Sequence, residues 1–172
     1  MFVKYNLGFL SLIDMHHLVF GNFLKNQNLC FLKDYVGPFL EEKISKIINI
    51  PVYNHLKYHL AKKNHVILMS SSPDFLVGPL AKLLNIKNSF ATSYLLDKSG
   101  NVTGIDYFLE GRLKAQFLDD HLRANKLECE KVTGFSDSID DLPLLERCSE
   151  VYLVNPSRDL IEKFIDKPHK II

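Results

Sequence analysis

The chain has 172 residues, of which 47% are hydrophobic and 24% are charged. This length suits one compact domain, or a domain with a small cap, and such a hydrophobic content excludes an intrinsically disordered chain. Lys and Arg total 21 and Asp and Glu total 20, so the net charge of +1 lacks the basic excess of nucleic-acid-binding proteins. The apolar runs, such as Val66–Met69, are too short to cross a membrane. We therefore expect a soluble globular protein with neither a nucleic-acid nor a membrane partner.

The three cysteines, Cys30, Cys129 and Cys148, lie far apart and form no C-x-x-C pair. This spacing favours neither a zinc knuckle nor a disulfide framework. The N-terminal stretch is interrupted by polar residues and by His16 and His17, which is not the pattern of a signal peptide. We expect a reducing, cytoplasmic setting.

Residues 1–63 are predicted to be mostly helical. Apolar residues recur at helical spacing between Leu7 and Leu24, and further helical stretches cover residues 31–48 and 51–63. Pro51 stands at a plausible first helical position. We interpret this region as a helical cap.

From residue 64 onward the pattern changes to alternating strands and helices. His65–Ser70 is predicted to be a buried strand, and Ser72-Pro73-Asp74 to open a helix that reaches Leu84. A second strand is expected at residues 90–95, before a hairpin turn at residues 98–101. The remaining predicted elements are a helix at 113–126, a strand at 130–135, a short helix at 140–147, a strand at 151–154 and a helix at 158–165. This alternation indicates an α/β fold with a parallel sheet over residues 64–172.

The first candidate binding segment is Ser70-Ser71-Ser72-Pro73. A strand end followed by a helix start places backbone N–H groups and a hydroxyl where they can bind phosphate. An ordinary serine helix cap would have the same sequence. The segment alone leaves both interpretations open.

The second candidate segment follows the strand at 130–135 and contains Asp137, Asp140 and Asp141. Three carboxylates in five residues at the carboxyl edge of a sheet favour a hard cation such as Mg²⁺, although a solvated acidic helix start is the plain alternative. Lys114 is predicted at the start of the helix between the two segments. The helix dipole disfavours a cation there, which suggests an anionic partner such as phosphate.

Taken in order, these segments resemble motifs two, three and four of the haloacid dehalogenase superfamily, and most of all its phosphoserine-phosphatase-like branch. The similarity rests on VILMSSSP (66–73), IKNSFATS (86–93), GRLKAQFL (111–118), FSDSIDDLPLL (135–145) and VYLVNP (151–156). The resemblance implies a Rossmann-like core over residues 64–172 behind an N-terminal helical cap at 1–63. It also implies Mg²⁺-dependent hydrolysis of a small phosphomonoester through an aspartyl-phosphate.

The same resemblance implies a role for each matching residue. Ser70 would hydrogen-bond a phosphate oxygen beside the Ser71 backbone N–H, and Lys114 would neutralise the phosphoryl group. Asp137 would bind Mg²⁺, and Asp141 would support the metal site or orient Lys114. Such roles suit phosphoryl transfer, which depends on positioning and charge neutralisation.

The family's first motif, a strand followed by D-x-D-x-T, is absent from these 172 residues. Its nearest imitation is Leu12–His17, where His16 stands in place of the second aspartate, and we expect Asp14 to lie in a turn between cap helices. The chain then lacks both the nucleophile and the central strand that carries it. Either a longer protein or a partner chain, including a second copy, would fill that gap, or the sheet is rearranged. The alternative function is a catalytically inactive phosphate-binding or protein-interaction domain.

Three further features have plain interpretations. Ser136 replaces a glycine that is usual in the family, and its side chain is expected to crowd the metal loop. His55 and His59 are four residues apart but lack a third ligand, so they are expected to be surface or packing residues. The aromatic stripe of Phe9, Phe20, Phe23, Phe31 and Phe39 is expected to pack in the core or cap.

Overall fold

The computed structural model describes residues 11–172. Contacts divide the chain into two units, one of residues up to 44 together with 70–108, and one of residues 45–69 together with 109–172. Each unit therefore combines a part of the predicted cap region (1–63) with a part of the predicted core (64–172). The two units are described separately below.

The first unit begins with helices, as the sequence predicts. These are α2 (Leu12–Val19), the π-helical turn η1 (Phe20–Leu24) and α3 (Leu29–Ile47), whose last residues belong to the second unit. Ser11 caps α2 in a capping box, in which the Ser11 hydroxyl and the Asp14 carboxylate each accept from the other's backbone N–H. Asp14 thus stands in the first turn of α2, and its expected place in a turn between helices is wrong.

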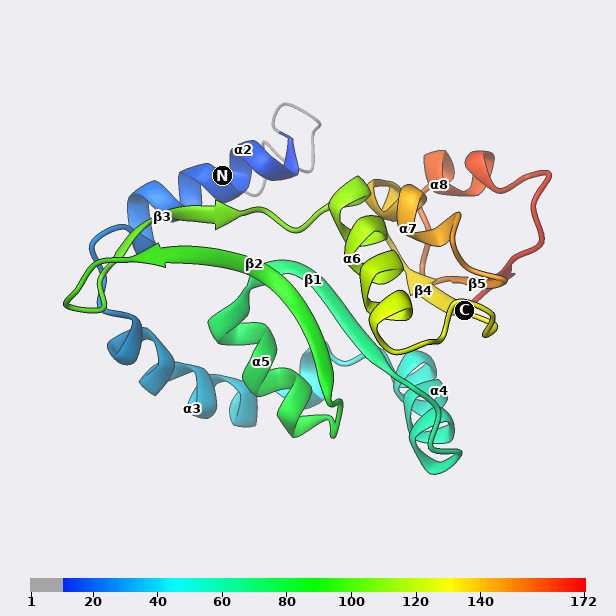
Figure 1. Cartoon of the computed structure of the whole chain (residues 1–172), viewed down its shortest axis with the longest axis horizontal. Helices are drawn as coiled ribbons and strands as arrows, with labels where there is room; N and C mark the ends of the chain where they lie inside the picture. Colours follow the sequence, from blue (N-terminus) through cyan, green and yellow to red (C-terminus); the bar gives the residue numbers. More distant parts are fainter. Residues whose placement is uncertain (1–10) are drawn as a thin grey trace. The chain divides into compact units, whose positions relative to one another are not determined.

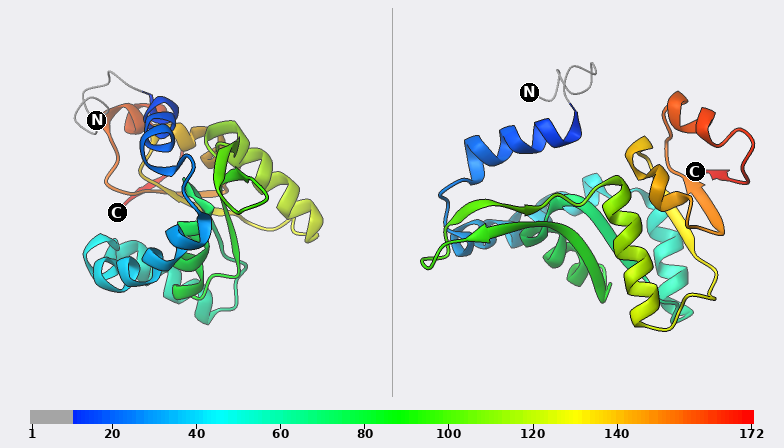
Figure 2. Two further views of the ribbon diagram at one scale, coloured as in Figure 1. Left: turned by 90° about the vertical axis from the view of Figure 1, so that its left-hand side faces the viewer. Right: turned by 45° about the horizontal axis from the view of Figure 1, so that its top comes forward.

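A three-stranded sheet has the order β1 (Ile67–Pro73), β2 (Asn88–Leu96) and β3 (Val102–Tyr107), and it belongs to the first unit except for residues 67–69 at the start of β1. Strands β2 and β3 are antiparallel and form a long twisted ribbon, along which α5 (Asp74–Leu83) packs (Figures 1 and 2). The predicted hairpin turn between them is confirmed. The Asp97 carboxylate accepts the backbone N–H groups of Ser99 and Asn101, and Gly100 takes a φ of +80°.

The core of the first unit brings the N-terminal helices onto this ribbon. Leu24, Tyr94 and Val102 are buried together, and Phe20 and Phe75 pack against them. The aromatic stripe is only partly accounted for, because Phe23, Phe31 and Phe39 are 64%, 52% and 45% exposed. Their expected burial is wrong, since they lie on outward faces of η1 and α3. Phe9 lies outside the described residues.

The second unit holds α4 (Ile50–Ala61), α6 (Gly111–Ala124) and a parallel sheet in the order β4 (Thr133–Ser136), β5 (Glu150–Leu153) and β6 (Lys170–Ile171). Between β4 and β5 the chain forms the 3-10 turn η2 (Ile139–Asp141) and α7 (Leu142–Leu145), and α8 (Arg158–Lys163) follows β5. Helix α6 runs beside α7 (Figure 1). The α/β fold class with parallel strands is confirmed.

The second unit's core anchors α7 and α8 to the parallel sheet. Leu145, Val151, Leu153, Leu160 and Phe164 are all at most 5% exposed and form one cluster. Strand β4 is an edge strand in this sheet. The described core therefore fixes the turn between β4 and α7, which carries the predicted acidic segment.

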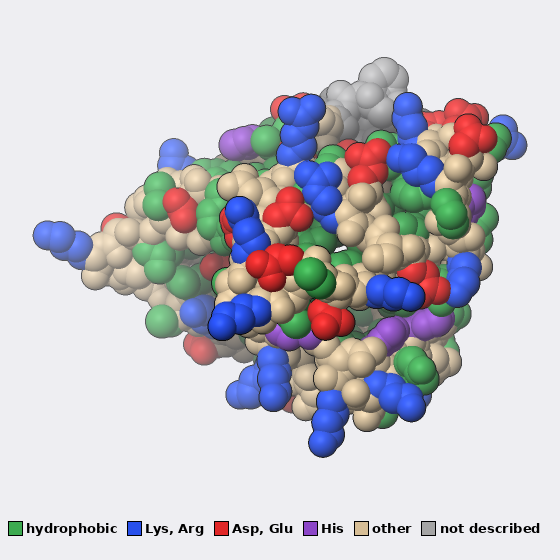
Figure 3. Space-filling model, turned by 45° about the vertical axis from the view of Figure 1, so that its right-hand side comes forward, with side chains coloured by type: hydrophobic (Ala, Val, Ile, Leu, Met, Phe, Trp, Pro, Cys, Tyr) green, Lys and Arg blue, Asp and Glu red, His purple; other side chains and the backbone are tan. Residues whose placement is uncertain are grey.

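The surface bears charges of both signs. Over the face drawn in Figure 3, Lys and Arg side chains are interspersed with Asp and Glu side chains. Among residues 11–172, none of the helices combines the length and the apolar character that crossing a membrane requires.

Candidate functional site

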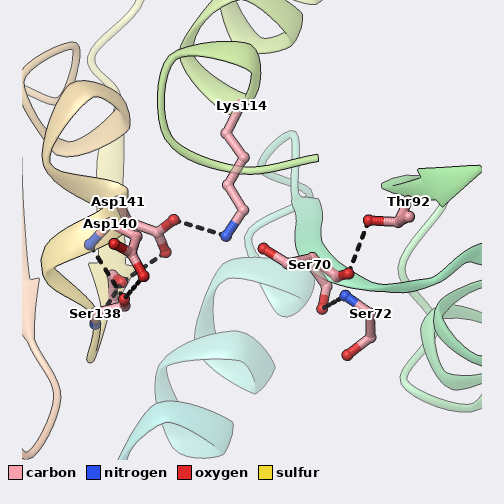
Figure 4. A network of polar contacts seen from close by, with 9 residues as sticks. Ser70, Ser72, Thr92, Lys114, Ser138, Asp140 and Asp141 are labelled. Atoms are coloured by element: carbon pink, nitrogen blue, oxygen red, sulfur yellow. Dashed lines mark hydrogen bonds and ion pairs between the residues drawn. The ribbon is translucent and has the colours of Figure 1, made fainter. Parts of the chain in front are cut away.

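The acidic segment sits at the carboxyl end of β4, in the second unit. Strand β4 ends at Ser136, whose hydroxyl accepts the backbone N–H of Ser138 at 3.1 Å. The Ser138 hydroxyl in turn accepts the backbone N–H of Asp140 at 3.2 Å and so caps η2. Two serine hydroxyls therefore shape the turn that carries the three aspartates, of which Figure 4 shows Asp140 and Asp141.

A buried ion pair lies at the centre of this turn. The Lys114 ammonium donates to Oδ1 of Asp141 at 2.6 Å, and the Ser136 hydroxyl donates to Oδ2 of the same carboxylate at 2.7 Å (Figure 4). Lys114, Asp141 and Ser136 are only 6%, 9% and 6% exposed. Because water is largely excluded, each charge depends on its partner for solvation. The carboxylate thus holds the ammonium group in one position.

Helix α6 brings Lys114 to that position. The helix begins at Gly111, two residues before its predicted start at Leu113, so Lys114 stands about one turn inside it and not at its very start. Gly111 has a φ of +43°, and a Cβ atom on it would lie 3.3 Å from the backbone oxygen of Asp140. Only glycine combines this conformation with such a close approach at little cost. The start of α6 therefore packs closely against η2.

Glu110, the N-cap residue of α6, places another carboxyl group near Lys114 and Asp140. Its pKa is raised, first by burial and then by the nearby Asp140 carboxylate, whereas Lys114 acts in the opposite direction. Negative charge is therefore concentrated around one buried ammonium group.

Asp137 and Asp140 are exposed, unlike Asp141. The Asp137 carboxylate makes no hydrogen bond or ion pair within the described part of the chain. Among residues 11–172 there is no group of three His, Cys, Asp or Glu side chains that could hold a metal ion. Mg²⁺ needs fewer, because it keeps several waters and binds through one or two carboxylates plus a substrate phosphate. Asp137 suits that role. Each oxygen of Asp141 accepts one hydrogen bond and keeps a further lone pair, so the expected support of the metal site by Asp141 stays a prediction.

The predicted phosphate-binding serines lie in the first unit. Strand β1 continues to Pro73, three residues beyond its predicted end, and Pro73 is the N-cap of α5 without a side-chain hydrogen bond. The serine-cap interpretation is therefore wrong. The Ser70 hydroxyl accepts the N–H of Ser72 at 3.1 Å, and the Ser71 carbonyl accepts from the buried Thr92 hydroxyl at 2.8 Å (Figure 4).

The structure also reveals what sequence reasoning missed. Ser136, which was expected to crowd the loop, is accommodated as a hydrogen-bonding partner of Asp141. The functions of Gly111 and Glu110 were not predicted either. A glycine before an amphipathic helix was the only signal for Gly111, and a serine five residues before Asp141 follows no recognisable spacing rule.

The histidines of α4 have separate surroundings. The His55 ring packs against Phe135 and Tyr152, with centroid distances of 5.2 and 4.7 Å. His59 contacts the Asn64 side chain at 2.8 Å. His55 therefore helps to cover the β4–β5 face, and its interpretation as a packing residue agrees with these contacts.

Comparison with known proteins adds family evidence to this geometry. The model of the haloacid dehalogenase-like hydrolase family matches residues 22–146. A probable phosphatase of Mycobacterium tuberculosis is 27% identical over 130 residues, which make up 75% of this chain and 45% of the relative. The chain thus spans about half the length of this curated relative.

Two solved structures share the fold. A Bordetella pertussis protein of unknown function matches with a TM-score of 0.84 at 20% identity. The match covers 99% of this chain and 78% of the Bordetella chain. A probable phosphoserine phosphatase of Vibrio cholerae matches with a TM-score of 0.70 at 12% identity. This match covers 93% of this chain and 47% of the Vibrio chain. At these identities the likeness concerns the fold alone.

Proposed function

Because this chain belongs to the haloacid dehalogenase-like hydrolase family, we propose that it forms the phosphate- and metal-binding part of a Mg²⁺-dependent phosphomonoesterase. The substrate would be a small phosphorylated molecule, and the reaction would pass through an aspartyl-phosphate. The M. tuberculosis relative, which is named a probable phosphatase, supports the same reaction class.

The Lys114–Asp141–Ser136 arrangement is the observation that carries this proposal. An ammonium group has three N–H donors, and within residues 11–172 Asp141 accepts one of them. The other two are available to a phosphoryl group. A fixed positive charge in a water-poor site stabilises the charge that develops during phosphoryl transfer. In this proposal Asp141 positions Lys114 and does not itself touch the substrate.

Mg²⁺ would be held by Asp137, and when bound it would neutralise charge on the substrate phosphate. Ser70 and Ser71 are proposed to bind phosphate oxygens, as the family resemblance implies. Ser70 suits this role chemically, since its hydroxyl accepts the N–H of Ser72 and keeps its own proton for donation.

We expect Mg²⁺ alone to bind this chain with a dissociation constant on the order of millimolar or weaker, because one free carboxylate is a poor cage for a strongly hydrated ion. Isothermal titration calorimetry measures this affinity. Micromolar binding would contradict the expectation and would bring Asp14 or Asp140 into the site.

The nucleophile is proposed to come from outside these 172 residues. The sequence has no D-x-D-x-T motif, and Asp14, its first acidic residue, is engaged in the capping box of α2. A strand that carries the motif could pair with the edge strand β4. A longer form of this protein, a partner chain or a second copy could supply it. We propose a reducing, cytoplasmic setting, because the cysteine spacing favours no disulfide framework.

Hydrolysis of p-nitrophenyl phosphate tests this function. The 172-residue chain and a form that includes any in-frame upstream coding sequence are assayed with Mg²⁺ and with EDTA. We expect turnover by the form that carries D-x-D-x-T, its loss in EDTA, and a large decrease in Asp137→Asn. Asp166→Asn is the matched control at an exposed position. Turnover that is indifferent to both EDTA and Asp137→Asn would overturn the proposal.

A second candidate function is phosphate binding without turnover. The absence of a D-x-D-x-T motif from these 172 residues favours it. Clear Mg²⁺-dependent turnover by the 172-residue chain, abolished by Asp137→Asn, would exclude this alternative.

A further inference from the structure

Two histidines far apart in sequence face each other in the second unit. His65 lies two residues before β1 begins, and His121 lies in the last turn of α6. Their Nε2 atoms are 2.7 Å apart, with ring centroids separated by 4.9 Å. His65 is exposed and His121 is half-buried, so the pair is open to solvent on one side.

The contact requires at least one neutral ring. At 2.7 Å one Nε2 must donate and the other must accept, and an imidazolium has no acceptor nitrogen. Burial and the neighbouring His65 both lower the pKa of His121, which favours its neutral form. Neutral imidazole is the form that binds transition metals.

We propose that His65 and His121 form a two-histidine site for a divalent transition metal ion such as Zn²⁺, bound through both Nε2 atoms. Two imidazole nitrogens at the usual zinc distance of about 2.0–2.1 Å would stand about 2.9–3.4 Å apart. Both Nε2 lone pairs must converge on the ion, so the rings would tilt away from their head-on contact while the two nitrogens separate by a few tenths of an ångström. Water would complete the coordination sphere, since no third His, Cys, Asp or Glu ligand joins the pair within residues 11–172.

This site is distinct from the proposed Mg²⁺ site. His121 and Lys114 are seven residues apart on α6, or about 10 Å along the helix axis. The ligands differ as well, because imidazole suits Zn²⁺, Cu²⁺ and Ni²⁺, whereas Mg²⁺ prefers oxygen. Asn125 lies beside the pair, with its side-chain nitrogen 3.4 Å from Nε2 of His121 and 2.8 Å from the His121 carbonyl oxygen that accepts its hydrogen bond. Because His65 precedes β1 and His121 lies in the last turn of α6, a bound ion would link these two segments.

Nuclear magnetic resonance of ¹⁵N-histidine-labelled protein, titrated with ZnCl₂, tests the proposal. We expect the Nε2 resonances of His65 and His121 to shift together at a one-to-one stoichiometry, and excess Mg²⁺ to leave them unchanged. Calorimetry should give at least about a tenfold loss of zinc affinity in His65→Gln, since loss of even outer-shell partners costs 10–100-fold.

His65→Gln is the principal variant because its position is exposed, and His121→Gln is compared after its thermal unfolding has been measured without metal. His59→Gln is the matched control, since His59 contacts an asparagine. Unchanged zinc affinity in His65→Gln would overturn the proposal, as would zinc binding that is lost in Cys129→Ser. Absence of Nε2 shifts up to millimolar zinc would overturn it as well.

Discussion

Lys114 and Asp141 are charged side chains held almost entirely out of water, so each is costly to bury without the other. Their side chains are 8% and 12% exposed, and the Ser136 hydroxyl supplies a further hydrogen bond. We expect Asp141→Asn to lower the free energy of unfolding by about 3–5 kcal/mol, because the Lys114 charge would then be buried without a counter-ion. Urea denaturation followed by circular dichroism measures the change.

Asp120 provides the matched control for this prediction. It pairs with Arg123 on α6, but the two side chains are 55% and 66% exposed. Asp120→Asn should change the unfolding free energy by less than about 1 kcal/mol, as is usual for exposed pairs. The account of the buried pair fails if the two variants are equally destabilised.

His16 predicts a pH dependence of stability in the first unit. Its Nε2 lies 2.6 Å from the hydroxyl of the buried Tyr94, and its ring contacts Phe108. Burial, and to a smaller extent His17, lowers the pKa of His16 below its ordinary value of 6.5. The unfolded chain therefore binds a proton more readily than the folded chain. The stabilisation from neutral His16 is complete above pH 6.5 and is lost as the pH falls through the folded pKa.

Urea denaturation between pH 7.5 and 5 tests this dependence. The stability of the wild-type chain should fall more steeply with decreasing pH than that of His16→Gln. His121 also titrates with a lowered pKa, but it is present in both proteins and cancels in the comparison. Parallel slopes for the two proteins would refute the assignment to His16.

At the residue scale, the sequence predicted the acidic turn and Lys114 but not how they are joined. Motif spacing placed Lys114 and Asp141 on elements that an α/β fold brings together. The part played by Ser136 depends on a hydroxyl that turns toward a side chain five residues on. That choice is made by tertiary packing, which a single sequence does not encode in a local pattern.

At the element scale, Gly111 and Gly78 form a natural pair for comparison. Gly111 needs a positive φ and approaches the Asp140 carbonyl, whereas a Cβ atom on Gly78, inside α5, would meet nothing within 4 Å. Gly111→Ala should destabilise the fold by at least about 1–2 kcal/mol. Gly78→Ala should stabilise it by about 0.4–1 kcal/mol, because alanine costs less entropy in a helix. Thermal or urea unfolding measures the change in unfolding free energy for each variant. Stabilisation by Gly111→Ala would contradict the close packing of the start of α6 against η2.

Elements with strong local signals were predicted well, and those that depend on pairing were not. The hairpin turn follows from Asp97 and Gly100, whose turn chemistry is visible in the sequence. Strand β1 extends to Pro73 because the sheet continues past the serines, which local propensity alone does not favour. Strand β6 has only two residues and exists by pairing with β5, so periodicity could not reveal it.

At the scale of the whole molecule, the fold class and the family were accessible from the order of the motifs. The division into two units could not be predicted from the sequence, because each unit combines N-terminal helices with later segments of the chain. Such long-range grouping depends on which apolar faces meet, and helical spacing does not determine that.

Calorimetric titration of this chain with inorganic phosphate, in the presence of Mg²⁺, tests the central claim most directly, since it needs no nucleophile. Lys114→Met should weaken phosphate binding at least about tenfold, because a fixed charge-assisted donor is lost, and Asp120→Asn should bind like the wild-type chain. Asp137→Asn, at an exposed position, should also weaken binding and guards against misfolding of the Lys114 variant. Unchanged phosphate affinity in a folded Lys114→Met variant would contradict the account.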